Sequence, residues 1–150
     1  MPETYKIAAA QIAPAFLDLE DCLQKAEHWI AEAGEQGVRL LVFPETWLPG
    51  YPVWIDTAPD AARWDHLPVK AVFRRLFENS PEIPSPATER LCVAAKNAGL
   101  TLIMGLNERD GRTPARRVVP AQPDARRPVD VRRLGNHRPE REVPGRTGWG

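Results

Sequence analysis

The chain has 150 residues, 43% of them hydrophobic, and its 20 Lys and Arg residues balance its 20 Asp and Glu residues. This length and apolar fraction fit a single globular domain with a hydrophobic core. The zero net charge is the sum of two unlike regions: residues 1–110 carry 10 basic and 16 acidic residues, and residues 111–150 carry 10 basic and 4 acidic residues. By itself it therefore says nothing about a partner.

Cysteine content and the N-terminus set the expected compartment. Two cysteines, Cys22 and Cys92, are too few for a disulfide framework or a metal cluster. The opening segment "MPETYKIAAAQIAP" lacks the basic residues of a secretory signal, and no apolar stretch reaches the roughly 18–20 residues of a membrane span. We therefore expect a cytoplasmic protein without a membrane partner.

The first half of the chain predicts a strand–helix–strand unit. Residues 5–14 read as a buried strand, Asp18 as a helix N-cap, and "VRLLVF" (38–43) as a second buried strand. The apolar positions of the helix recur at spacings of three and four: Leu19, Cys22, Leu23, Ala26, Trp29, Ile30 and Ala33. Because such crossovers join parallel strands, Glu45 is expected just past the carboxyl end of a parallel strand, where ligand sites usually form.

The second half predicts a long loop, two helices and one more strand. Residues 46–67 form a proline-broken loop, and residues 68–78 form a helix. Ser85 caps a further helix whose first residue is Pro86. A third strand follows over "LTLIMGLN" (100–107). We predict that the Arg- and Pro-rich residues 112–150 are disordered, because they offer little apolar area to offset the entropy cost of ordering.

Glu45 has two interpretations on pattern alone. Three aromatic residues follow it in the loop: Trp47, Tyr51 and Trp54. If these aromatic side chains surround Glu45, they would partly desolvate its carboxylate and raise its pKa toward the range of a general base. Alternatively, Glu45 caps a turn or pairs with Arg39 or Arg63. The pattern by itself slightly favours this structural interpretation.

Four segments, in this order and spacing, shift that balance. They are "KIAAAQIAP", the amphipathic helix, "LLVFPETWLPGYPVWID" and "AAKNAGLTLIMGLNERDG". Together, residues 5–111 resemble the N-terminal part of the nitrilase branch of the carbon–nitrogen hydrolase superfamily. "FPETWLPGYPVWID" is the most specific of these segments, and the Pro-Gly-Tyr-Pro run followed by Trp54 is similar to true nitrilases.

The resemblance implies an α/β fold, a partial α-β-β-α sandwich, whose domains pack helix to helix into homo-oligomers. It implies catalysis by Glu, Lys and Cys on a small-molecule nitrile, without a cofactor or metal. A cysteine thiolate adds to the nitrile carbon, the Glu acts as general base, and the Lys stabilises the developing negative charge. Glu45 matches the general base, and Tyr51 and Trp54 are candidate residues of the substrate pocket.

The chain departs from the family after Gly111. Family members continue with a Thr-Leu-Tyr-Asn strand and later segments that hold the Lys and the Cys, whereas residues 112–150 contain neither residue type. Cys22 and Cys92 both lie on predicted helices and read as structural thiols. We therefore expect a truncated domain over 1–111 with no nucleophile. It is a nitrilase-type hydrolase by lineage, or a non-catalytic module that associates with other chains or aggregates.

Two explanations for residues 112–150 are open. An arginine-rich arm can bind nucleic acid through phosphates, but this segment also has four acids and one aromatic residue, Trp149. A reading-frame change in a GC-rich gene gives the same Arg, Pro, Gly and Ala bias. We favour the frame change and expect no nucleic-acid partner.

Overall fold

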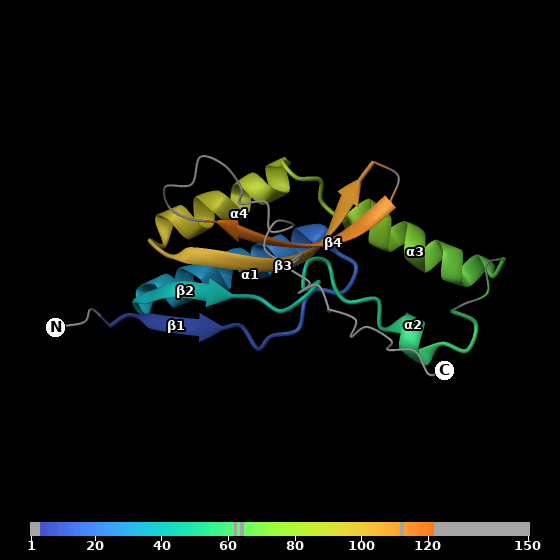
Figure 1. Cartoon of the computed structure of the whole chain (residues 1–150), viewed down its shortest axis with the longest axis horizontal. Coiled ribbons are helices and arrows are strands. Elements are labelled where there is room, and N and C mark those ends of the chain that lie inside the picture. Colours follow the sequence, from blue (N-terminus) through green and yellow to red (C-terminus); the bar gives the residue numbers. More distant parts are fainter. Residues whose placement is uncertain (1–3, 62, 64, 112, 122–150) are drawn as a thin grey trace, which may run out of the picture.

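The computed structural model describes residues 4–61, 63, 65–111 and 113–121. One four-stranded sheet forms its centre, with the strand order β1-β2-β3-β4 (Figure 1). Its strands are β1 (Lys6–Ala9), β2 (Val38–Val42), β3 (Thr101–Asp110) and β4 (Thr113–Ala121). β1, β2 and β3 are parallel, and β4 pairs antiparallel with β3. The predicted strand–helix–strand crossover is therefore confirmed.

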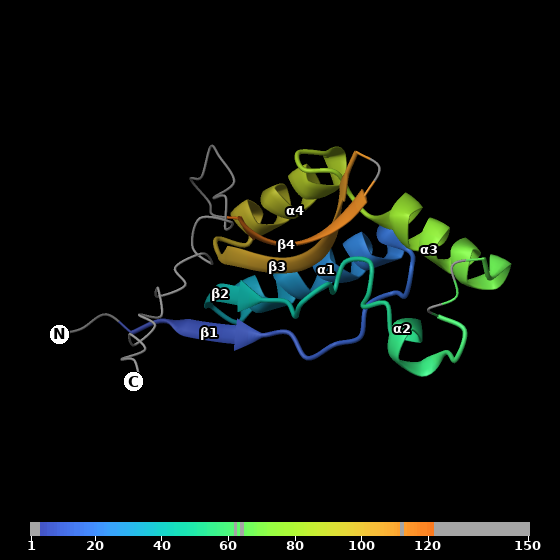
Figure 2. The same cartoon turned by 45° about the vertical axis from the view of Figure 1, so that its right-hand side comes forward.

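Two helices cover one face of the sheet. The helices are α1 (Leu19–Glu35), α2 (Trp54–Thr57), α3 (Leu67–Asn79) and α4 (Pro86–Asn97). α1 and α4 lie side by side against this face, while α2 and α3 lie beyond the carboxyl ends of β1 and β2 (Figures 1 and 2). No helix in the described part of the chain is long and apolar enough to cross a membrane.

The helix starts follow the sequence signals. The Asp18 carboxylate accepts a hydrogen bond from the Asp21 amide at 3.0 Å and so caps α1. Ser85 and Thr88 form a reciprocal capping box at the start of α4. Both helices therefore begin at the predicted residues, because these short side chains satisfy amides that have no partner inside the helix.

The core lies between the sheet and these two helices. Strand register places Ala8, Leu41 and Leu102 in one row on the helix-covered face. The buried side chains of α1 that meet this face are Cys22, Leu23, Ala26, Ile30 and Ala33. Trp29 was also predicted to face inward, but 37% of its surface is exposed.

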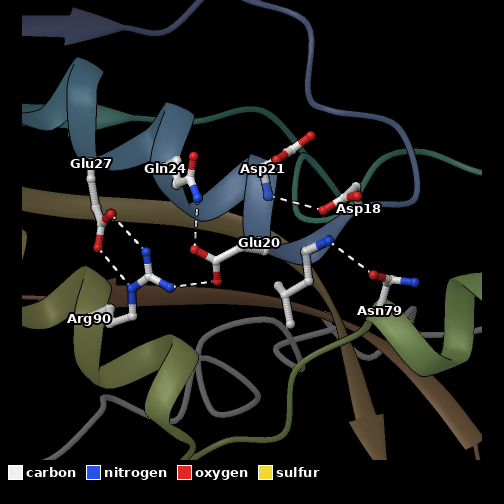
Figure 3. A network of polar contacts seen from close by, with 8 residues as sticks. Asp18, Glu20, Asp21, Gln24, Glu27, Asn79 and Arg90 are labelled. Carbon is white, nitrogen blue, oxygen red and sulfur yellow. Dashed lines mark hydrogen bonds and ion pairs between the residues drawn. The ribbon is translucent and has the colours of Figure 1, made fainter.

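Polar contacts fasten the two covering helices to each other. Arg90 of α4 donates to Glu20 at 2.7 Å and to Glu27 at 2.9 Å, and both carboxylates lie on α1 (Figure 3). Hydrogen bonds from Arg90 and from Gln24 lower the pKa of the Glu20 carboxyl. At the start of α1, the Leu19 amide donates to Asn79 of α3 at 3.0 Å. The layer of helices is therefore joined by charge as well as by apolar contact.

Three further sequence predictions, on secondary structure, are wrong in part. β1 is only four residues long and is not buried, since it lies at the edge of the described sheet and Ile7 is 65% exposed. A short helix, α2, interrupts the segment predicted as a continuous loop.

The third correction concerns the predicted disordered tail. Residues 113–121 form β4, although their sequence shows no strand periodicity. Backbone pairing with β3 accounts for this strand, because main-chain hydrogen bonds do not depend on which side chains alternate. Residues 122–150 of the predicted tail lie outside the described residues.

Candidate active site

The candidate site is the turn that follows β2. After β2 ends, the chain continues alongside β3: the Phe43 amide donates to the Ile103 carbonyl at 2.8 Å, and the Leu48 amide donates to the Gly105 carbonyl at 3.2 Å. Glu45 lies between these two attachments. The turn therefore stands at the carboxyl end of β2, which is the position predicted from the crossover.

Burial changes sharply along the turn. Glu45 is exposed, whereas residues 46–50 are all buried. Thr46 has a φ of 51°, Gly50 has a φ of 125°, and the Thr46 hydroxyl donates to the Glu45 carbonyl at 2.8 Å. The arrangement places the exposed Glu45 on a backbone that is hydrogen-bonded to β3 before and after it.

Gly105 and Asn107 of β3 contact the turn, and neither contact was predicted from the sequence. A Cβ atom at Gly105 would overlap the Pro44 carbonyl and lie 2.8 Å from the Glu45 Cα. The buried Asn107 donates through Nδ2 to the Gly50 carbonyl at 3.0 Å. A lone glycine within an apolar strand pattern is the signal that could have indicated the first contact, because it often marks a close backbone approach.

Of the three aromatic residues that follow Glu45, Trp47 is buried in the core. Trp47 is only 2% exposed, its ring packs edge-on against Phe43, and its Nε1 donates to the Ile12 carbonyl at 2.8 Å. Trp47 therefore anchors the turn to the core and is no wall of an open site. Glu45 itself is exposed, and its assignment as the general base stays a prediction.

Tyr51 and Trp54 lie farther along the loop. Tyr51 is 42% exposed. The Trp54 ring stands between Phe16 and Phe73, with ring centroids 5.9 and 5.4 Å away. Its Nε1 is buried without a hydrogen-bond partner among the described residues. Trp54 thus joins α2 to α3, and the assignment of Tyr51 and Trp54 to a substrate pocket stays a prediction.

Neither cysteine has the properties of a nucleophile. Cys22 is buried on α1 and donates to the Ala15 carbonyl at 3.0 Å, and its burial raises the pKa of the thiol to about 11. Partial desolvation, and then the nearby Glu89, raise the pKa of the Cys92 thiol as well. Both thiols stay protonated at neutral pH, whereas the thiolate is the reactive form. Among the described residues, no group of three His, Cys, Asp or Glu side chains is placed to hold a metal ion.

Comparisons with known proteins extend over most of the chain. The sequence profile of the family described as carbon-nitrogen hydrolase matches residues 6–138. A protein named nitrilase 2, from an unknown prokaryotic organism, is 43% identical over 102 residues, which are 68% of this chain and 31% of that protein. The aliphatic nitrilase of Rhodococcus rhodochrous is 37% identical over 111 residues, which are 72% of this chain and 28% of that protein.

Solved structures share the fold. An amidase from Nesterenkonia sp. matches with a TM-score of 0.53 at 23% identity, covering 82% of this chain and 40% of the amidase. The chain matches less than a third of the length of each of the two nitrilases. The chain spans 31% of nitrilase 2 and 28% of the Rhodococcus enzyme.

Proposed function

The chain belongs to the carbon–nitrogen hydrolase family and corresponds to the N-terminal portion of its nitrilase branch, and we propose that Glu45 is the general base of a nitrilase-type reaction. That reaction converts a nitrile and two waters into a carboxylic acid and ammonia. The observation that supports this role is the exposed Glu45 carboxylate at the carboxyl end of β2, on a turn hydrogen-bonded to β3.

In this reaction Glu45 moves protons while other groups form the covalent bonds. Glu45 takes the proton of a cysteine thiol, and the thiolate adds to the nitrile carbon to give a thioimidate. Water then adds, ammonia leaves, and a second water hydrolyses the thioester, with the carboxylate again accepting the proton of the attacking water. The thiol returns to its starting state at the end of the cycle.

The chain of 150 residues lacks the partners that this mechanism needs. No Lys or Cys follows Gly111 in the sequence, and both earlier cysteines are protonated helix residues. We therefore expect residues 1–150 alone to be inactive toward nitriles. Two cysteines without a disulfide agree with the reducing environment of the cytoplasm, where we place the protein.

A second candidate function is a non-catalytic module that associates with other chains. One observation favours it: the sheet face opposite α1 and α4 carries partly exposed apolar side chains, among them Ile7, Leu40 and Ile103. Exposed apolar surface of this kind favours association. The two candidates are compatible, because a domain can keep its general base while it lacks a nucleophile.

A chimera tests the catalytic proposal. Residues 1–111 of this chain replace the matching segment of the Rhodococcus rhodochrous aliphatic nitrilase, and ammonia release is measured with a panel of nitriles. We expect the Glu45→Gln substitution to lower kcat at least about 100-fold, because a positioned general base contributes roughly 10²–10⁴-fold. The chimera with Glu89→Gln is the matched control, since Glu89 is an exposed carboxylate on α4.

The intact chain of 150 residues provides the complementary measurement. It should release no ammonia above the blank. Turnover by this chain that survives Cys22→Ala combined with Cys92→Ala, but is lost with Glu45→Gln, would overturn the thiol mechanism. An active chimera that tolerates Glu45→Gln would show that Glu45 is not the base.

A further inference from the structure

We propose that Gly105 and Asn107 of β3 are positioning residues that together fix the Glu45 turn. This inference rests on the proposed function of Glu45, since a general base works only when its carboxylate is held at a defined place. The two residues act on the turn in different ways. Gly105 admits the backbone of Pro44 and Glu45, and Asn107 holds the end of the turn.

Hydrogen bonds from Asn107 hold the turn after Glu45. The Asn107 amide donates to the Leu48 carbonyl at 2.8 Å, and its side-chain Nδ2 donates to the Gly50 carbonyl at 3.0 Å. Asn107 is 5% exposed, so its side chain would be unsatisfied without this partner. One β3 residue therefore fixes two carbonyls of the segment that returns from Glu45.

The absence of a side chain at Gly105 sets how closely the turn approaches β3. A Cβ atom there would overlap the Pro44 carbonyl and stand 2.8 Å from the Glu45 Cα. These neighbours are backbone atoms, so they cannot move aside by a change of rotamer. Any larger residue at this position must therefore displace the backbone that carries the Glu45 carboxylate.

Both contacts converge on one turn from neighbouring places on a single strand. Gly105 and Asn107 are two residues apart in β3, and between them Leu106 pairs with Leu48 as an isolated parallel bridge. β3 itself pairs with β2 on one side and β4 on the other. The turn is therefore attached to a central strand of the described sheet. This attachment supports Glu45, although Glu45 lies outside regular secondary structure.

Two matched pairs of variants of the full chain test this inference. Gly105→Ala is compared with Gly34→Ala, because a Cβ atom at Gly34 also meets tight neighbours, 2.8 Å from the Ala98 Cβ. Asn107→Ala is compared with Ser80→Ala, because Ser80 is also buried and donates to a backbone carbonyl, that of Leu76, at 2.7 Å. Each control disturbs packing or a buried hydrogen bond away from the Glu45 turn.

Two measurements report on the turn itself, and both can be made even if the chain self-associates. Hydrogen exchange followed by mass spectrometry measures the opening of residues 44–50. Carbodiimide-driven amidation, followed across pH by peptide mass spectrometry, measures the titration of the Glu45 carboxylate against exposed Glu89 in the same sample. A residue with a merely structural role would lower the melting temperature without changing the Glu45 titration relative to Glu89.

We expect exchange in residues 44–50 to become about three- to tenfold faster in Asn107→Ala, as the loss of one buried hydrogen bond predicts. We expect the midpoint of Glu45 amidation to shift in Asn107→Ala and Gly105→Ala, and to stay in place in Gly34→Ala and Ser80→Ala. If Gly105→Ala does not fold, the comparison of Asn107→Ala with Ser80→Ala tests the inference.

An unchanged Glu45 midpoint and unchanged exchange in a folded Asn107→Ala chain would overturn the inference, as would equal changes in the controls. Failure of the proposed function is a separate result. It appears in the chimera, as nitrile turnover that survives Glu45→Gln, and it leaves these labelling measurements unaffected.

Discussion

The two faces of the sheet differ in how completely the described chain covers them. On one face, Leu41 and Leu102 are 4% and 1% exposed beneath α1 and α4. On the other face, Ile7 is 65% exposed, and its row partner Leu40 is only partly buried. Both faces carry apolar residues, so the difference comes from what covers each face and not from composition.

This asymmetry agrees with the share of the relatives that the chain spans. It corresponds to about 30% of the nitrilases that it matches, and sandwich folds bury the second face of each sheet against a further layer. The helix-covered face can form from local strand–helix contacts within residues 1–121. The described residues leave the opposite face partly exposed, so we expect it to be the weaker half of the structure.

The largest expected effect is on the covered face. Leu102→Ala should lower the free energy of unfolding by about 2–5 kcal/mol, because it leaves a cavity beneath both helices. Ile7 lies on the opposite, partly exposed face, which we call the open face. Ile7→Ala should lower the free energy of unfolding by less than about 1 kcal/mol. Urea unfolding at low protein concentration, followed by tryptophan fluorescence, measures both values. Equal losses would show that the open face is covered in solution.

The next effect concerns association through the open face. We expect the wild-type chain to self-associate or to bind the dye ANS, because exposed apolar surface and an unpaired edge strand favour both. Val42 lies on the same face, in the row of Ile103. Ile7→Thr combined with Val42→Thr keeps strand propensity and should weaken self-association by about 2 kcal/mol in sedimentation velocity experiments. Leu67→Gln, a change at an exposed position of α3, serves as the control. A wild-type monomer with a sharp cooperative melt and no dye binding would contradict this expectation.

The smallest effect is electrostatic and lies on the covered side. Arg90 lowers the pKa of the Glu20 carboxyl, so the stabilisation from this carboxylate is present above its unfolded pKa and is lost as the pH falls through the lower, folded value. The melting temperature of Arg90→Ala should therefore lie below that of the wild type at neutral pH. The gap should narrow as the solution becomes more acidic than the ordinary carboxyl range.

Arg74→Ala provides the comparison for this measurement. Arg74 is exposed and makes one long ion pair, 3.9 Å from Glu78, so its removal should change the melting temperature little at any pH. A gap that stays constant with pH in Arg90→Ala would indicate that Arg90 stabilises the helix pair by packing alone.

Neighbouring residues in the sequence predict where α1 and α4 begin and where Glu45 lies. Helix caps at Asp18 and Ser85 and the apolar face of α1 follow from neighbouring residues, which is why they could be predicted. The crossover rule then placed Glu45 at the carboxyl end of β2. The segment "FPETWLPGYPVWID" identified the family that the comparisons confirm.

How the turn is held, and which residues surround it, depends on contacts between distant parts of the chain. The contacts of Gly105 and Asn107 with the turn join positions about 60 residues apart, and no local pattern encodes that pairing. Burial of Trp47 and exposure of Glu45 depend on which layer covers them. The strand β4 forms by main-chain pairing with β3, and the periodicity of its side chains does not predict that pairing. Local sequence signals fix α1 and α4, but the geometry of the site comes from contacts between distant segments.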